Sequence, residues 1–218
     1  MKKVLVFLIP VFIFVLPVFF VRASENVTSV LVEDFNELWT YTASENLDKE
    51  KAKITIVDAG ANNDLLYPEE SQGRPKKSLG FKCGFYNQGF NWITFFPPKP
   101  IVLPGKAKKI QLWVMGMKYR YNLEIWLEDY LGMAHKIDMG SIYFSGWKSM
   151  TREIPWYVPQ QESSYPMDRP LKITKIILRA DPDERCDRFY IYLDQIRIIT
   201  DIYEEPFDGL DLIKKSGW

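Results

Sequence analysis

The sequence contains few of the residues that build catalytic or metal centres. His135 is the only histidine among 218 residues, and Cys83 and Cys186 are the only two cysteines. A metal motif with two histidines is therefore excluded, and a Ser-His-Asp triad would have to use His135, which no GxSxG motif accompanies. The cysteines form no CxxC pair, and neither GxxxxGK[ST] nor GxGxxG occurs. We therefore expect that the protein is not an enzyme.

The chain also lacks an excess of charge of either sign. It contains 28 basic and 28 acidic residues. Three of the basic residues lie within residues 1–23, so the remaining 195 residues carry 25 basic and 28 acidic side chains, a net charge of −3. A strongly basic surface of the kind that binds nucleic acid is excluded. The length suits one domain with a full core.

The N-terminus has the order of a secretory signal. A basic start at residues 1–3 precedes an apolar run over 4–21, and Ala23 offers a cleavage site. The run reaches the lower limit for spanning a bilayer, so a retained membrane anchor is the alternative. Pro10 and Pro17 interrupt the run, and no basic cluster follows it. We therefore expect residues 1–23 to be a cleaved signal peptide, after which the chain has no stable membrane insertion.

Residues 24–218 have the pattern of one all-β domain with a short C-terminal tail at 206–218. Aromatic residues make up 15% of the chain, and apolar residues alternate with polar ones between turn signals. This pattern predicts a two-sheet sandwich of jelly-roll type. It also indicates a bulge near Asp194-Gln195 and short helical turns at 31–38 and 208–215. The strands are expected at 54–57, 79–85, 91–96, 109–117, 122–128, 134–139, 147–154, 171–180 and 189–199.

Several aromatic residues are candidates for a binding surface. Trp113 and Trp126 lie on the phase of their strands opposite to the core residues, and Tyr190 and Tyr192 share one phase of the last strand. Trp218 ends the apolar tail. Such rings can stack on sugars or fill a protein interface. The alternative is that both faces of these strands are buried, which periodicity does not distinguish.

Carboxylates and cysteines offer two further candidate sites. Glu33 and Asp34 near the mature N-terminus could meet Asp194 if the first and last strands are neighbours, and hard oxygen ligands would suit a structural Ca²⁺. Ordinary capping and turn hydrogen bonds are the alternative. Cys83 and Cys186 could form a disulfide in an oxidising compartment, or they could be two isolated thiols. No other cofactor is expected.

Five segments, spread over nearly the whole mature chain, carry one resemblance: Val32-Glu33-Asp34-Phe35, 101–106 running into 110–114, 123–129, 139–142 leading to Gly146-Trp147-Lys148, and 189–196. Together they resemble one known family, the flagellar filament outer-layer (sheath) proteins of spirochaetes. The same segments are similar to sugar-binding jelly-roll modules of galactose-binding-like type, above all in the Leu-Pro-Gly turn and the Gly-Trp-Lys step.

The resemblance implies a structural role in the periplasm. A sheath protein coats a flagellin core, so the expected partners are filament core subunits and sibling sheath proteins. Bound copies would tune the shape and stiffness of the periplasmic flagellar filament. The alternative is an envelope carbohydrate-binding module for peptidoglycan or another glycan.

The signal sequence gives a direct prediction. The mature protein should begin at Ser24, because Val21 and Ala23 supply suitable −3 and −1 residues for signal peptidase. Amino-terminal sequencing of the native protein measures this. Recovery of a chain that starts at Met1 in the membrane fraction would show that the segment is a retained anchor.

Overall fold

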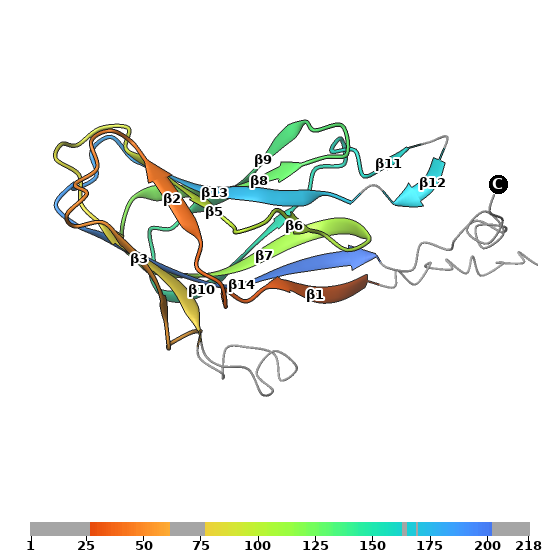
Figure 1. Cartoon of the computed structure of the whole chain (residues 1–218), viewed down its shortest axis with the longest axis horizontal. Helices are drawn as coiled ribbons and strands as arrows, with labels where there is room; N and C mark the ends of the chain where they lie inside the picture. Colours follow the sequence, from red (N-terminus) through yellow and green to blue (C-terminus); the bar gives the residue numbers. More distant parts are fainter. Residues whose placement is uncertain (1–26, 62–76, 163–164, 169, 202–218) are drawn as a thin grey trace, which may run out of the picture.

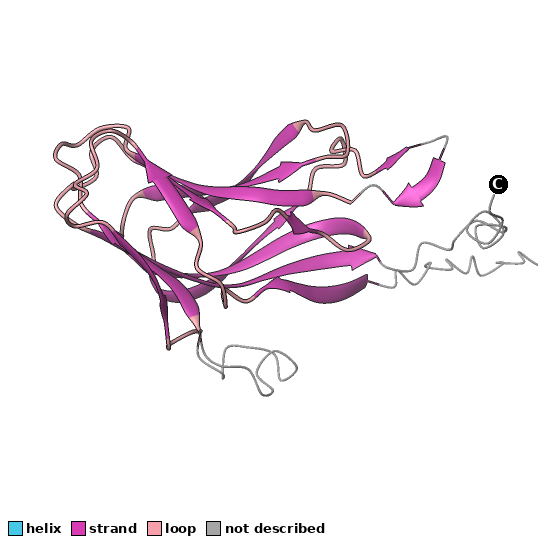
Figure 2. Cartoon of the chain, viewed as in Figure 1, coloured by secondary structure: helices cyan, strands magenta, loops and turns pink. Residues whose placement is uncertain are grey.

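Strands and their connecting turns make up the described part of the protein. The computed structural model describes residues 27–61, 77–162, 165–168 and 170–201. Figure 2 shows that these ranges contain no helix. The predicted signal peptide 1–23 and the tail 206–218 with Trp218 lie outside the described residues, as does the helical turn expected at 208–215.

Two antiparallel six-stranded sheets form the domain (Figure 1). The first sheet has the order β10-β7-β14-β4-β3, and β1 also pairs with β14. Its strands are β1 (Val27–Glu33), β3 (Lys53–Val57), β4 (Ser78–Cys83), β7 (Lys106–Met117), β10 (Ser145–Glu153) and β14 (Phe189–Asp201).

The second sheet has the order β2-β5-β13-β8-β9, and β6 also pairs with β13. A separate two-stranded sheet is formed by β11 (Gln161–Glu162) and β12 (Tyr165–Asp168). The strands of the second sheet are β2 (Thr40–Ala43), β5 (Trp92–Phe96), β6 (Ile101–Val102), β8 (Tyr121–Glu128), β9 (Ala134–Ser141) and β13 (Lys172–Ala180).

The connectivity is that of a jelly roll. The chain crosses from one sheet to the other between β1 and β2, β2 and β3, β4 and β5, β6 and β7, β7 and β8, β9 and β10, β10 and β13 (through β11 and β12), and β13 and β14. Most neighbouring strands are therefore not consecutive in sequence, unlike those of a meander. The predicted two-sheet jelly-roll sandwich is confirmed.

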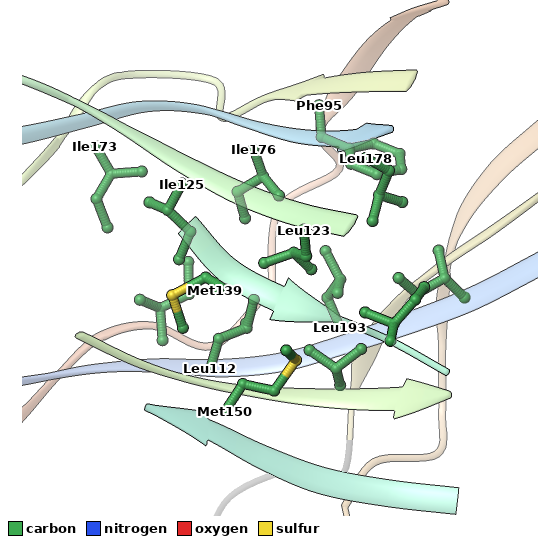
Figure 3. Close-up of a cluster of buried hydrophobic side chains, with 14 of the residues drawn as sticks. Phe95, Leu112, Leu123, Ile125, Met139, Met150, Ile173, Ile176, Leu178 and Leu193 are labelled. Carbon is green, nitrogen blue, oxygen red and sulfur yellow. The ribbon is translucent and has the colours of Figure 1, made fainter. Parts of the chain in front are cut away.

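The core fills the space between the two sheets. Leu112 and Val114 of β7 and Leu123, Ile125 and Leu127 of β8 are fully buried, as their alternation predicts. Figure 3 shows Leu123, Ile125 and Met139 from the second sheet above Leu112 and Met150 from the first. Residues from both sheets belong to one continuous apolar cluster. The other face of each sheet points away from this cluster.

The last strand contains the predicted bulge. Its register against β7 shifts between Asp194 and Ile196, and Gln195 has a φ of 44°. The helical turn predicted at 31–38 is wrong. Residues 27–33 pair with β14 instead, and the rings of Phe35 and Trp39 lie 5.1 Å apart inside the core. Sheet pairing and aromatic burial therefore outweigh the local helical pattern.

An aspartate organises the turn between β8 and β9. Asp129 Oδ1 accepts hydrogen bonds from the amides of Leu131 and Met133, at 2.8 and 2.9 Å, and Oδ2 lies 2.7 Å from His135 Nε2. Gly132 takes the positive φ of 79° that the turn requires. Burial alone would raise the pKa of Asp129, but these hydrogen bonds outweigh it and hold the pKa below its usual value. His135 thus has a structural partner.

We predict that Asp129→Asn lowers the free energy of unfolding by about 1–3 kcal/mol at neutral pH. The side-chain amide of Asn has one accepting oxygen, whereas the carboxylate of Asp129 accepts hydrogen bonds with two. A carboxyl whose folded pKa is lowered stabilises the fold above its unfolded pKa, and the contribution disappears as the pH falls through the folded value. The difference in unfolding free energy between variant and wild type, measured by urea unfolding, should therefore be smaller at about pH 3 than at pH 7. An equal difference at both pH values would contradict this role.

Candidate functional site

The outer face of the second sheet carries a cluster of charged residues around Trp126. Trp126 of β8 pairs with Lys175 of β13 on one side and Lys136 of β9 on the other. The Lys175 ammonium lies 4.8 Å from the centre of the indole ring, a cation–π distance. Trp126 is half-buried on the outer face of the second sheet. We call Glu124, Trp126, Lys136, Lys175 and Arg179 the Trp126 cluster.

Glu124 is the acceptor that holds the Trp126 cluster together. It lies two residues before Trp126 on the same strand, and Trp126 Nε1 donates to its Oε2 at 3.1 Å. Arg179 Nε donates to Oε1 at 3.0 Å, and Lys136 Nζ lies 3.8 Å from the same oxygen. Glu124 is only 4% exposed although it faces away from the core. Its charged and aromatic neighbours therefore cover it, and the indole is fixed in place.

Trp113 does not belong to an exposed surface, which matches the alternative that both faces of its strand are buried. It points away from the inter-sheet core, as its phase requires, but it is only 7% exposed. Its strand neighbour Asp194 is also buried and accepts a hydrogen bond from the amide of Ala61 at 2.9 Å. Residues after β3 therefore pack over this part of the first sheet. Both sides of β7 are buried at Trp113.

Tyr190 and Tyr192 line a groove on the outer face of the first sheet. Both rings are half-exposed, and the groove of about 210 Å³ also includes Lys53 and Lys82. Tyr192 lies close above Gly80, where an added Cβ would come within 3.1 Å of the ring. A side chain at Gly80 would displace the tyrosine. The structure therefore brings these two candidates together, far from Trp126 on the opposite sheet.

The predicted calcium ligands make turn and loop contacts. Glu33 Oε1 accepts from the amide of Phe35 at 2.6 Å, and Asp34 Oδ2 accepts from Asn36 at 2.6 Å. Burial raises the pKa of Glu33 above its usual value. Within the described ranges, no three His, Cys, Asp or Glu side chains form a group that could hold a metal ion. These contacts match the capping and turn alternative.

The two cysteines are free thiols. Cys83 is buried at the end of β4, and Cys186 lies partly exposed in the connection between β13 and β14. Burial raises the pKa of Cys83 to about 12, so its thiol stays protonated and unreactive. Of the two alternatives given by the sequence, the structure has the isolated thiols.

Two exposed aromatic residues were not predicted from the sequence pattern. Trp156 and Phe90 are 94% and 84% exposed, and both lie in connections between strands. Pro155 beside Trp156 and Gly89 beside Phe90 mark these connections as turns and were the available signal. The partners of Glu124 could not be read from the sequence, because Arg179 lies 55 residues away.

Comparison with known proteins places the chain in a family. The family model for flagellar filament outer layer protein FlaA matches residues 25–207. The chain belongs to the flagellar filament outer layer family. A flagellar filament outer layer-like protein of Brachyspira hyodysenteriae is 27% identical to this outer layer protein over 184 residues, which cover 84% of each chain.

A second relative is the flagellar filament outer layer protein of Spirochaeta aurantia, 30% identical over 105 residues, which span 44% of this outer layer protein and 31% of the relative. Among solved structures, a family 11 carbohydrate-binding module of a cellulosomal cellulase of Clostridium thermocellum is similar, with a TM-score of 0.43 and 15% identity. That match covers 79% of this chain and 95% of the module. The described ranges contain no helix long and apolar enough to cross a membrane.

The Trp126 cluster gives a stability prediction. Glu124→Ala should lower the free energy of unfolding by about 1–3 kcal/mol, because the indole N–H and two cations lose a buried acceptor. The matched control is Glu128→Ala on the same strand and face. Glu128 pairs with Lys172 at 3.8 Å while about 40% exposed, so its loss should cost at most about 1 kcal/mol. Urea unfolding of both variants measures the difference, and equal losses would contradict the role of Glu124.

Proposed function

We propose that this chain is a coat subunit of the periplasmic flagellar filament, where it binds filament core subunits and sibling outer-layer proteins. The observation that carries the proposal is the family match over residues 25–207, which spans the whole described sandwich. Copies bound along the filament would add a rigid layer and so change its stiffness and curvature. The role is mechanical and needs no catalytic group.

A coat subunit needs two kinds of contact, one with the core and one with its neighbours. The sandwich offers candidate surfaces on opposite faces, the Trp126 cluster on the second sheet and the Tyr190–Tyr192 groove on the first. Tryptophan, tyrosine and arginine are the side chains that most often dominate binding energies at protein interfaces. Their fixed positions reduce the entropy lost on binding.

Contacts around Trp126 favour a protein partner over a sugar. Lys175 lies over the indole ring, and Nε1 already donates to Glu124. A sugar ring that stacked on that face would have to displace the ammonium. A protein surface can instead pack against the exposed edge of the indole and pair with Lys136 and Lys175, which are rim charges.

The test of this proposal is Trp126→Ala. An interface tryptophan typically contributes about 2 kcal/mol, so the variant should bind purified filaments roughly thirtyfold more weakly while it remains folded and exported. Quantitative mass spectrometry of filaments from complemented deletion cells measures its occupancy. Trp156→Ala is the matched control, because Trp156 is 94% exposed in a loop outside both sheet faces.

Two results would count against the proposal at different levels. Normal occupancy of the folded Trp126→Ala variant would show that this face does not dock on the filament. A gene deletion that leaves filament diameter, curvature and swimming unchanged would contradict the coat function itself. In that case, retention of the wild type on an immobilised glycan would favour the carbohydrate-binding alternative.

A further inference from the structure

A hollow at one end of the sandwich adjoins the Trp126 cluster, with which it shares Arg179. It has a volume of about 480 Å³ and lies where β8 and β13 meet the connections that follow β7 and β13. This volume is within the usual range for small-molecule sites. We call it the end pocket. Its polar lining consists of Arg120, Asn122, Ser141, Tyr143, Arg179 and Asp181.

Strand register places three of these polar side chains in one row. Asn122 of β8 pairs with Arg179 of β13 on one side and with Ser141 of β9 on the other. Arg179 is oriented by its Nε contact with buried Glu124, which uses one of the five N–H donors of the guanidinium. Ser141 Oγ accepts from the amide of Tyr143 and keeps its own proton for a further bond. The row therefore offers fixed donors and acceptors to a ligand.

The second arginine, Arg120, is held by residues of the connection that follows β13. Arg120 donates to the carbonyl of Asp183 at 2.6 Å, and its guanidinium lies 3.6 Å from Glu184 and 3.9 Å from Asp181. Each arginine thus has a carboxylate beside it, and the carboxylate of Asp181 lines the pocket itself. The pocket is rich in hydrogen-bonding groups without an excess of positive charge. This balance favours a neutral polyhydroxylated ligand over an anion.

The floor and the rim suit the ring of a sugar. Tyr121 and Ala180, two buried core residues, also line the pocket. Tyr143 lines the pocket from the turn between β9 and β10 and is 59% exposed. An exposed aromatic ring beside planar hydrogen-bonding groups can stack on the apolar face of a sugar while amide and guanidinium groups bind its hydroxyls. No cation–π contact of Tyr143 competes among those found in the described residues.

We propose that the end pocket is a binding site for a neutral sugar unit of an oligosaccharide. Tyr143 supplies the stacking face, and Arg179, Asn122 and Ser141 bind the hydroxyls. The site lies at the end of the sandwich, beside the Trp126 cluster with which it shares Arg179.

The test is an NMR titration of the isotope-labelled mature chain with cellotriose, with chitotriose and with a short glutamate-rich peptide. We expect saturable shifts of the lining residues with at least one trisaccharide. Tyr143→Ala and Arg179→Lys should each weaken that binding about tenfold, since the first removes the stacking ring and the second keeps the charge beside Glu124 but loses the guanidinium fork.

Tyr86→Ala is the control, because Tyr86 is 65% exposed in the β4–β5 connection at the same end but outside the end pocket. Its binding should equal that of the wild type, and urea unfolding checks that all three variants are folded. The proposal is overturned if neither trisaccharide gives saturable shifts up to tens of millimolar, or if Tyr143→Ala binds as well as the wild type. Saturation of the pocket by the acidic peptide alone would identify it as a protein contact instead.

Discussion

Apolar packing between the two sheets is the interaction on which the other features depend. β7 and β14 of one sheet and β8 and β13 of the other supply most of the fully buried aliphatic side chains. Each such side chain stabilises the fold by about 1.5–3 kcal/mol. This packing buries the side chains of the central strands that point inward. The side chains that point outward can therefore be charged or aromatic. The Trp126 cluster and the Tyr190–Tyr192 groove both consist of such outward-pointing side chains.

The sequence predicts the fold well wherever alternation is regular. Ile125 and Trp126 show why: a period of two assigns neighbouring residues to opposite faces, and the structure buries the first completely and leaves the second half-exposed. The bulge at Asp194-Gln195 was also predictable, because a polar pair interrupts an apolar strand there. Local signals failed at 31–38, where the pairing partner lies at the far end of the chain.

The site was only partly predictable because its contacts connect residues far apart in sequence. Periodicity assigns Trp113 to an outer face but does not show that this face is buried there, beside the contact between Asp194 and Ala61. Periodicity also assigns Glu124 to the outer face of its sheet but does not show that Arg179 and Lys136 lie beside it. Proximity of Glu33 to the last strand was correctly expected, yet Glu33 and Asp34 bond within their own turn and Asp194 bonds the amide of Ala61.

The pairing of the first and last strands has a consequence for the timing of folding. Val27 at the start of β1 lies opposite Asp201 at the end of β14, and within the described residues β14 is the only strand partner of β1. The first sheet therefore cannot be completed until almost the entire chain has been made, and such long-range pairing forms slowly. β1 pairs with the part of β14 after the bulge, which β4 does not reach, so until β1 joins the sheet that edge of β14 presents unpaired N–H and C=O groups.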